Sequence, residues 1–215
     1  MTVFIAAIIV FWGLEYKTAF LETYLNGEWR VGDCEVALTF DDCPSEPYTS
    51  MILDILKEND VEATFFIIGE RAIEYPWVIN RMITDGHSIG NHGYTDSRPA
   101  LLGDDNVEEE IIKTQDILED ITGERPRLFR LPSGIPRRDI KNVINEENLR
   151  IIFADVVVLN EREKAFDEIV RNILKKVDSG SIILLHGDHI GVVKSLDDII
   201  LEIKKYNLKF VRLAY

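Results

Sequence analysis

Short apolar runs alternate with longer amphipathic segments along most of this chain of 215 residues. The apolar runs are rich in Val, Ile, Leu and Phe and are bounded by polar residues, which is typical of buried strands. The pattern predicts strands at Val36–Phe40, Ala63–Ile68, Ser88–Gly90, Leu128–Leu131, Ile151–Phe153, Val156–Leu159, Ser181–Leu185 and Leu208–Leu213.

The segments between these runs carry apolar residues at helical spacing. In one of them Ile111, Leu118 and Ile121 recur near the helical period, and the acidic run Glu108–Glu110 lies at the N-terminal end, where the helix dipole favours negative charge. The pattern predicts helices at Tyr48–Glu58, Pro76–Asp85, Val107–Ile121, Pro136–Glu146, Lys164–Val177 and Leu196–Tyr206. Because parallel strands need crossover helices, this alternation predicts an α/β fold built on a parallel sheet or barrel.

The chain has the size and composition of one soluble domain, with 46% hydrophobic and 29% charged residues. We see no internal repeat and no linker that would divide it. We place the domain at residues 33–215 and an N-terminal extension at residues 1–32, with the boundary near Arg30–Asp33.

The extension contains a nearly continuous apolar run, Val3–Trp12. The run is too short to cross a bilayer comfortably but has the length of a signal-peptide core. It lacks a preceding Lys or Arg and a clear cleavage site, so a strand or helix packed on the domain remains an alternative. We expect a secreted protein, or one at the cell surface or cell wall.

The net charge of −14 argues against nucleic acid and anionic membrane surfaces as partners. A neutral substrate, such as an acetylated polysaccharide, is compatible with this charge. The excess of Asp and Glu also serves solubility, which is its commoner role.

Candidate chemistry lies in three segments, Thr39–Pro44, Gly86–Asp96 and Leu184–His186. The first places Asp41 and Asp42 at the end of an apolar strand, where neighbouring side chains point to opposite faces unless the strand bends. An Asp-Asp pair alone is typical of a solvated turn. Combined with imidazoles in the other two segments, it indicates a metal-assisted hydrolase.

The segment Thr39-Phe40-Asp41-Asp42-Cys43-Pro44 resembles the TFDDGP signature of the polysaccharide deacetylases, also called the NodB-homology domain or carbohydrate esterase family 4. The resemblance continues in order through Ala63–Phe66, Gly86–His92, Phe129–Gly134, Ile183–His186 and Leu208–Leu213. It implies a distorted (β/α) barrel and the removal of acetyl groups from polymers of N-acetylated sugars.

The resemblance also implies roles for individual residues. Asp41 would be the general base, His186 the general acid, and Arg130 would brace Asp41. Asp42 and His92 would bind a divalent metal, which is zinc by resemblance. Pro132, Leu159 and Leu184 would line the substrate groove.

The sequence departs from the family pattern at several positions. Asp96 stands where the family has a second metal-binding His, and a carboxylate there favours Mn²⁺ or Mg²⁺, with Co²⁺ also possible, over Zn²⁺. Val158 and Leu159 replace an acid that tunes the catalytic His and a groove Trp, so activity is weak or absent if these groups are essential. Cys43 replaces the motif Gly, and we do not expect it to act as a nucleophile.

The remaining His and Cys residues are interpreted as structural. We expect His87 to be a hydrogen-bonded His and His189 a loop residue, neither of them a ligand. Cys34 and Cys43 flank an extended strand, so they lie too far apart for a disulfide.

Three functions remain open. The first is a deacetylase of N-acetylglucosamine polymers, with chitin preferred because Cys34 before the strand resembles eukaryotic chitin deacetylases. The second is a pseudoenzyme that retains carbohydrate binding at the cell wall. The third is an O-acetyl esterase or a small-molecule amidohydrolase.

Overall fold

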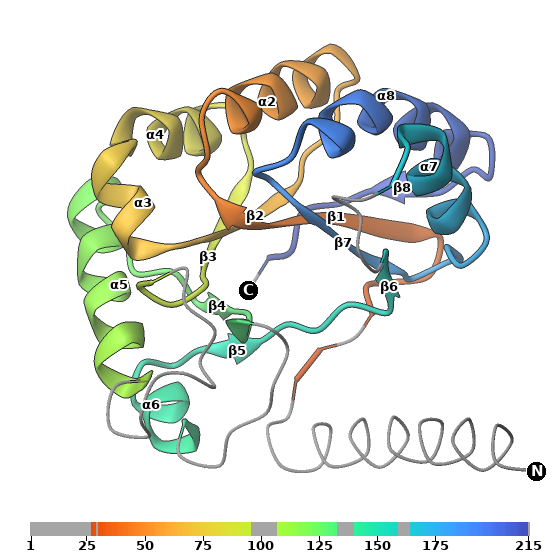
Figure 1. Ribbon diagram of the computed structural model, residues 1–215. Helices are drawn as coiled ribbons and strands as arrows, with labels where there is room; N and C mark the ends of the chain where they lie inside the picture. The colour runs from red at the N-terminus through yellow and green to blue at the C-terminus, as the bar shows by residue number, and fades with distance from the viewer. Residues whose placement is uncertain (1–26, 29, 96–106, 133–139, 159–163, 215) are drawn as a thin grey trace, which may run out of the picture.

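The computed structural model describes residues 27–28, 30–95, 107–132, 140–158 and 164–214. Within them a curled parallel sheet is covered on its outer side by helices (Figure 1). The strands are β1 (Glu35–Cys43), β2 (Thr64–Ile67), β3 (Ser88–Asn91), β4 (Leu128–Phe129), β5 (Arg150–Ile151), β6 (Val156–Val157), β7 (Ile182–His186) and β8 (Lys209–Phe210). The helices are α2 (Tyr48–Glu58), α3 (Gly69–Glu74), α4 (Pro76–Thr84), α5 (Val107–Thr122), α6 (Lys141–Glu146), α7 (Phe166–Leu174) and α8 (Ile190–Lys204).

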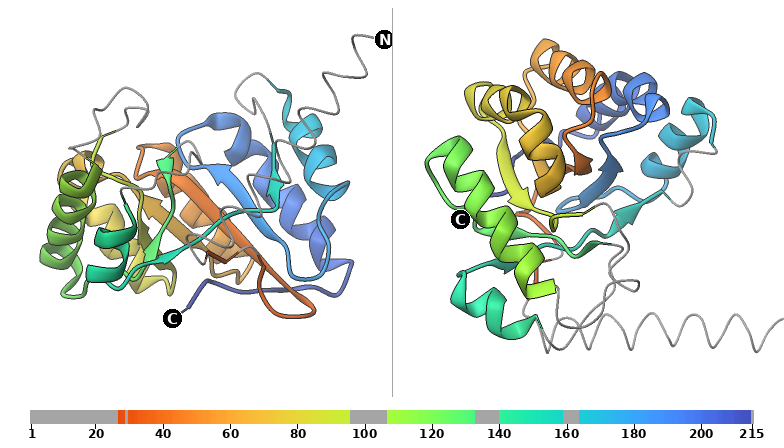
Figure 2. Two further views of the ribbon diagram at one scale, coloured as in Figure 1. Left: turned by 90° about the horizontal axis from the view of Figure 1, so that it is seen from below. Right: turned by 60° about the vertical axis from the view of Figure 1, so that its left-hand side comes forward.

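The described strands follow the order β5-β4-β3-β2-β1-β7-β6, and β8 pairs with the start of β1. All of these pairings are parallel, and the helices that connect the strands lie around the convex side, as the two views of Figure 2 show. This arrangement agrees with the predicted distorted (β/α) barrel. In such a fold the C-terminal ends of the strands meet at one edge, where loops can gather functional side chains.

Two apolar layers hold the sheet in place. Val36, Leu38 and Phe40 of β1 point outward into a large cluster that also contains Leu196 and Ile200 of α8. Residues of opposite parity, such as Ala37, belong to a smaller cluster on the inner side with Phe66 and Ile182. Because successive side chains alternate between the faces, Thr39 and Asp41 follow Ala37 to the inner side.

Most elements lie where the sequence predicts them, and the differences have local causes. Helix α2 has the predicted bounds, whereas the strands predicted near residues 151 and 208 shorten to two residues each. The prediction missed α3, a helix of six residues that starts with a glycine. It also placed the start of α8 at Leu196, but the helix starts at Ile190. Of the predicted helix Pro136–Glu146, residues 136–139 lie outside the described part.

Residues before β1 are attached to the sheet. The backbone of Glu28 pairs with Ile152, and the backbone of Arg30 pairs with Ser181. The Arg30 guanidinium binds Asp155 at 2.9 Å and also contacts Asp178. This segment therefore joins the end of β5 to the start of β7. The boundary between residues 32 and 33 stays a prediction, and residues 1–26 lie outside the described part.

Candidate active site

The end of β1 bends, and the bend places two adjacent carboxylates on one site. Register with β2 shifts between Phe40 and Cys43, and Asp42 has a φ of 57°, in the left-handed region. A regular strand would send Asp41 and Asp42 to opposite faces. Because of the bend, an oxygen of each lies within 4 Å of the same nitrogen, Nε2 of His92, at 3.8 and 3.6 Å.

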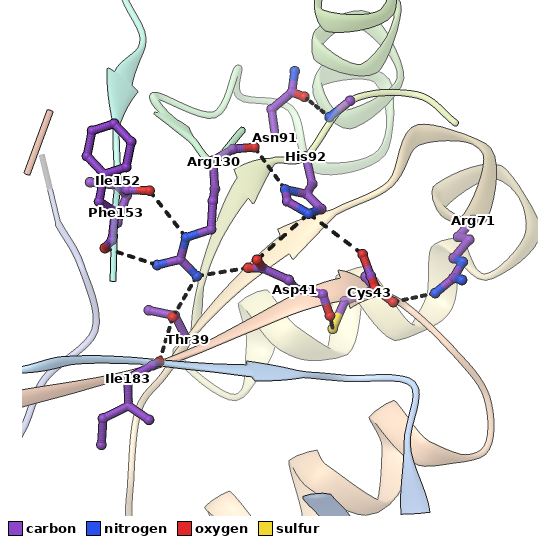
Figure 3. Close-up of polar contacts among 12 residues, drawn as sticks. Thr39, Asp41, Cys43, Arg71, Asn91, His92, Arg130, Ile152, Phe153 and Ile183 are labelled. Atoms are coloured by element: carbon purple, nitrogen blue, oxygen red, sulfur yellow. Dashed lines mark hydrogen bonds and ion pairs between the residues drawn. The ribbon is translucent and has the colours of Figure 1, made fainter. Parts of the chain in front are cut away.

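Arg130, which follows β4, is buried and holds Asp41 (Figure 3). Its Nη1 donates to Asp41 Oδ1 at 2.8 Å and to Thr39 Oγ1 at 2.7 Å. Its other nitrogens donate to the backbone carbonyls of Ile152 and Phe153. Because each of its three nitrogens donates to a fixed acceptor, the guanidinium presents a rigid positive charge to the Asp41 carboxylate.

His92 follows β3, and a hydrogen bond at Nδ1 fixes the orientation of its ring. Its Nδ1 lies 2.8 Å from the backbone carbonyl of Arg130, so Nδ1 carries the proton and donates it. Nε2 is then an unprotonated acceptor in the neutral ring and faces Asp41 and Asp42. A ring held in this way through its other nitrogen is typical of a metal-binding His.

His186 ends β7, directly beside Asp41 of β1. The two residues are register partners, and the backbone N–H of Gly187 donates to the Asp41 carbonyl at 2.8 Å. The positive form of His186 interacts favourably with the charges of both Asp41 and Asp42. The sheet therefore brings Asp41, Asp42, His92, Arg130 and His186 to one edge.

The two carboxyl groups have different pKa shifts. Burial alone would raise the pKa of Asp41, but Arg130, His92 and His186 outweigh it, and the pKa lies below its ordinary value. Burial raises the pKa of Asp42, and the neighbouring charges of Asp41 and Asp188 add to this, although His92 and His186 oppose it. Asp41 is thus the carboxylate held ionised by the protein, while Asp42 would be stabilised as an anion by an additional cation.

The side chains that meet at this site have the chemistry to bind a divalent cation. In the neutral His92 ring an unprotonated nitrogen faces two carboxylates in a buried place, and a cation between them would relieve the repulsion. Two of the predicted ligands are described by the structure, Asp42 and His92, and Oδ1 of Asp42 lies 3.6 Å from Nε2 of His92. Within the described residues no group of three or more His, Cys, Asp or Glu side chains is arranged to hold a metal. Asp96, the third predicted ligand, lies outside the described part.

Cys43 is buried, and burial raises the pKa of its thiol well above the ordinary value, with the charges of Asp42 and Asp41 adding to the effect. A protonated thiol is a poor nucleophile. Its Sγ fills the space at Gly187, where an added Cβ would lie 2.2 Å from the sulfur. Cys34 and Cys43 are both free, as predicted.

Three supporting side chains were not singled out from the sequence. Asn91 Oδ1 accepts from the Gly93 N–H at 2.8 Å, and its amide donates to α5. Glu110 of α5 accepts the N–H groups of Tyr94 and Thr95 at 2.9 and 2.7 Å. Arg71 of α3 donates to the carbonyl of Asp42. Asn91 lies in a quoted motif, but Glu110 and Arg71 reach the site only through helix packing.

The predicted groove residues are placed in part. Leu184 is half-buried on β7 opposite Thr39, and Pro132 packs beside Gly93. Leu159 lies outside the described residues. The effect of Val158 on His186 stays a prediction: Val158 is buried in the apolar cluster that also contains Leu185, the residue before His186 on β7.

The two other His residues have structural contacts. His87 is buried, and its Nδ1 accepts the N–H of Ala63 at 3.1 Å. His189 is the N-cap of α8 and accepts the N–H of Gly191. Asp155 also has a structural contact, because its carboxylate accepts the N–H of Ile182 at 2.7 Å.

Comparison with known proteins places this chain among polysaccharide deacetylases. The family model for polysaccharide deacetylase matches residues 30–152. A peptidoglycan-N-acetylglucosamine deacetylase of Bacillus cereus is 36% identical over 206 residues, covering 94% of this chain and 72% of that protein.

Solved structures agree. The Bc1960 peptidoglycan N-acetylglucosamine deacetylase is 35% identical with a TM-score of 0.83, covering 91% of this chain and 94% of that one. BA3943 from Bacillus anthracis, described as a CE4 family pseudoenzyme, is 26% identical with a TM-score of 0.79, covering 86% of this chain and 66% of that one.

Proposed function

Because the chain belongs to the polysaccharide deacetylase family, we propose that it is a metal-dependent hydrolase that removes N-acetyl groups from peptidoglycan N-acetylglucosamine. One observation carries the proposal: Nε2 of His92 lies 3.8 and 3.6 Å from carboxylate oxygens of Asp41 and Asp42, and Arg130 forms an ion pair with Asp41 at 2.8 Å. A cation bound by Asp42 and His92 would therefore lie next to Asp41, an ionised carboxylate that can act as a base.

We assign the proton transfers to two residues. Arg130 donates to Asp41 Oδ1, so Asp41 Oδ2 is the oxygen that takes a proton from the attacking water. His186, beside Asp41 in the sheet, gives a proton to the nitrogen of the departing amine. Arg130 acts through Asp41, because its hydrogen bonds keep that carboxylate oriented and charged.

A divalent cation, when bound, supplies polarisation of the amide carbonyl and acidification of a water. We propose Asp42, His92 and Asp96 as its ligands. Zinc is the metal by family resemblance, while a set with two carboxylates and one imidazole favours Mn²⁺, Co²⁺ or Mg²⁺ more than a set with two imidazoles would.

We propose peptidoglycan rather than chitin because a relative whose match covers 94% of this chain is named for peptidoglycan. The preference for chitin rested on Cys34, which is a free, exposed thiol. The net charge of −14 supports a glycan partner over nucleic acid or an anionic membrane.

Acetate release tests the function. Purified protein is incubated with peptidoglycan fragments and chitin oligomers, with Zn²⁺, Co²⁺, Mn²⁺ or Mg²⁺ added in turn. Asp41→Asn should lower turnover by about 100- to 10,000-fold, as expected for a lost general base. Asp54→Asn, which alters a carboxylate paired with Arg81 on the surface, is the matched control. Absence of metal-stimulated acetate release from either polymer would contradict the proposal.

A pseudoenzyme is the second candidate, favoured by Asp96 in place of an expected His ligand. A mutant of the related BA3943 pseudoenzyme is described as having restored enzymatic activity, so this fold can lose and regain chemistry. Glycan binding without acetate release would identify this case. Release from acetylated xylan or small amides, but not from the amino-sugar polymers, would identify the O-acetyl esterase or amidohydrolase alternative.

We also propose that the first residues direct the protein to the secretory route. The support is the apolar run Val3–Trp12, since the proposed substrate lies outside the cell. None of the helices in the described ranges is both long and apolar enough to cross a membrane. A reporter fused to residues 1–30 tests the proposal, and a reporter that stays inside the cell would refute it.

A further inference from the structure

Arg71 connects two loops of the active site. It lies on α3, after β2, and its guanidinium reaches across to the end of β1 (Figure 3). There Nη1 donates to the backbone carbonyl of Asp42. On the other side, Nη2 lies 3.9 Å from Oδ2 of Asp188, two residues after His186.

The loop after β7 is also tied to β1 through its backbone. The Gly187 N–H donates to the Asp41 carbonyl at 2.8 Å, and the Gly187 carbonyl accepts from Thr49 Oγ1 at 3.2 Å. Arg71 adds a contact between charged side chains to this pair of hydrogen bonds. The segment from His186 to Asp188 is therefore held against the carboxylates from several directions.

The side chains of Arg71 and Asp188 are largely shielded from solvent, which strengthens the interaction between their charges. The side chains of Arg71 and Asp188 are 19% and 8% exposed. Asp188 is a third negative charge near Asp41 and Asp42. Its charge helps to raise the pKa of the Asp42 carboxyl. A buried carboxylate beside two others needs a nearby cation, and Arg71 supplies it.

We propose that Arg71 is a positioning residue: its guanidinium fixes the loop that carries His186 relative to the bent end of β1 that carries Asp41 and Asp42. The inference rests on the proposed deacetylase function and deepens it. Two separate nitrogens of a planar fork are needed to reach the Asp42 carbonyl and the Asp188 carboxylate together. Lysine, with a single ammonium, would keep the charge but not this geometry.

Arg71→Met and Arg71→Lys test the proposal, with Arg81→Met as the matched control. Arg81 also bridges two carboxylates, Asp54 and Asp85, but these lie on α2 and after α4, away from the site. The first measurement is hydrogen exchange of the Gly187 amide, which needs no activity. The second is kcat and KM for acetate release.

Arg71→Met should speed exchange at Gly187 while Ile183, in the middle of β7, stays protected. It should lower kcat by up to about 100-fold, the cost of a misplaced catalytic group, with little change in KM. Arg71→Lys should fall between the wild type and Arg71→Met in both measurements. Arg81→Met should leave both unchanged.

Unchanged Gly187 exchange in a folded Arg71→Met protein would overturn the proposal, as would equal loss of protection at Gly187 and Ile183, which indicates general destabilisation. If Arg71→Met does not fold, Asp188→Asn decides, because it removes the charge contact at nearly constant volume and should also loosen Gly187. A wild type that releases no acetate would count against the deacetylase function alone. The exchange measurements would still decide the role of Arg71.

Discussion

Buried charges at this site are stabilised by fixed partners, and Arg130 is the clearest case. It is 4% exposed and provides the cation for Asp41. Arg130→Met would leave the Asp41 carboxylate buried without its main partner. We expect the free energy of unfolding to fall by about 3–5 kcal/mol, the usual cost of breaking a buried pair from one side. Urea unfolding measures this.

Arg125→Met is the control for that prediction. Arg125 contacts Asp116, Glu119 and Glu147 but is 37% exposed, so its ion pairs are screened by solvent. We expect a loss of no more than about 1 kcal/mol. Equal losses in the two variants would contradict the view that burial, rather than the number of ion pairs, decides the contribution.

His87 should make stability depend on pH. Burial is the main cause that lowers its pKa from 6.5 to about 4, although Asp85 and Glu62 oppose the shift. Between these values the unfolded chain binds a proton at this position and the folded protein does not. Stability is therefore full above the unfolded pKa and is lost as pH falls toward the folded one, by up to about 3 kcal/mol.

Urea unfolding at about pH 7 and about pH 5 tests this dependence. His87→Asn retains an acceptor for the Ala63 N–H but cannot be protonated in this range, so it should lose this part of the pH dependence. His189→Asn, at the N-cap of α8, leaves His87 in place and should retain it. A wild-type difference that survives unchanged in His87→Asn would show that another group is responsible.

The sequence identified Asp41, Asp42, His92, Arg130 and His186 because their motifs are short and ordered. Their contacts could not all be predicted. Pleating alone separates Asp41 from Asp42, and only the left-handed backbone at Asp42 brings both toward His92. Arg71 was missed because its partners, Asp42 and Asp188, are far from it in the sequence. A pattern of neighbouring residues cannot predict such contacts.

At the level of elements, β1 and the loop after β7 fit each other through Cys43 and Gly187. The family motif has Gly at position 43, and here the larger thiol occupies the space beside Gly187. Gly187→Ala should therefore displace the loop and reduce stability by about 1–3 kcal/mol through overpacking. The double variant Cys43→Gly/Gly187→Ala should lose less stability than the sum of the losses in the two single variants. The reason is that Cys43→Gly removes the thiol that the new Cβ at position 187 would meet.

A double-mutant cycle of these two substitutions measures the fit. We expect a favourable coupling of about 1 kcal/mol or more between positions 43 and 187, since residues in direct contact couple on this scale. Gly123→Ala is a contrast, because nothing lies within 4 Å of an added Cβ there and only its φ of 81° opposes the change. Additive effects at positions 43 and 187 would contradict the steric argument.

Element boundaries were hardest to predict where capping and packing oppose local propensity. Helix α8 begins at Ile190 because His189 caps it and Val192, Val193 and Leu196 are buried against the sheet. Gly191 and two β-branched residues made this first turn look non-helical. Helix α2 was predicted correctly because its apolar face is clear and because Pro47 and Asn59 flank it.

For the molecule as a whole, strand alternation predicted the curled parallel sheet, but not how its two sides are connected. Glu28 pairs with Ile152 and Arg30 with Ser181, contacts that join residues more than a hundred positions apart. Such pairings depend on how the whole sheet curls. They leave no periodic signal in the sequence before β1, so we expected only an extension there.

Metal binding should be visible as stability of the whole molecule, because a ligand that binds only the folded state stabilises it by mass action. Asp42 and His92 come from β1 and from the residue after β3, so unfolding destroys the site. A metal present at about 100 times its dissociation constant should raise the free energy of unfolding by about 2.7 kcal/mol. Asp42→Asn should remove most of this gain, and Asp54→Asn should retain it.

The choice of metal then tests the role of Asp96. With Asp42, His92 and Asp96 as ligands, Mn²⁺ or Mg²⁺ should stabilise the wild type relatively well and Zn²⁺ should have no large advantage. Asp96→His adds an imidazole and removes a negative charge, which should increase the zinc gain selectively. Thermal unfolding with each metal at several concentrations gives the comparison. A zinc gain that is already large in the wild type and does not change in Asp96→His would show that Asp96 is not a ligand, and that another donor completes the site with Asp42 and His92.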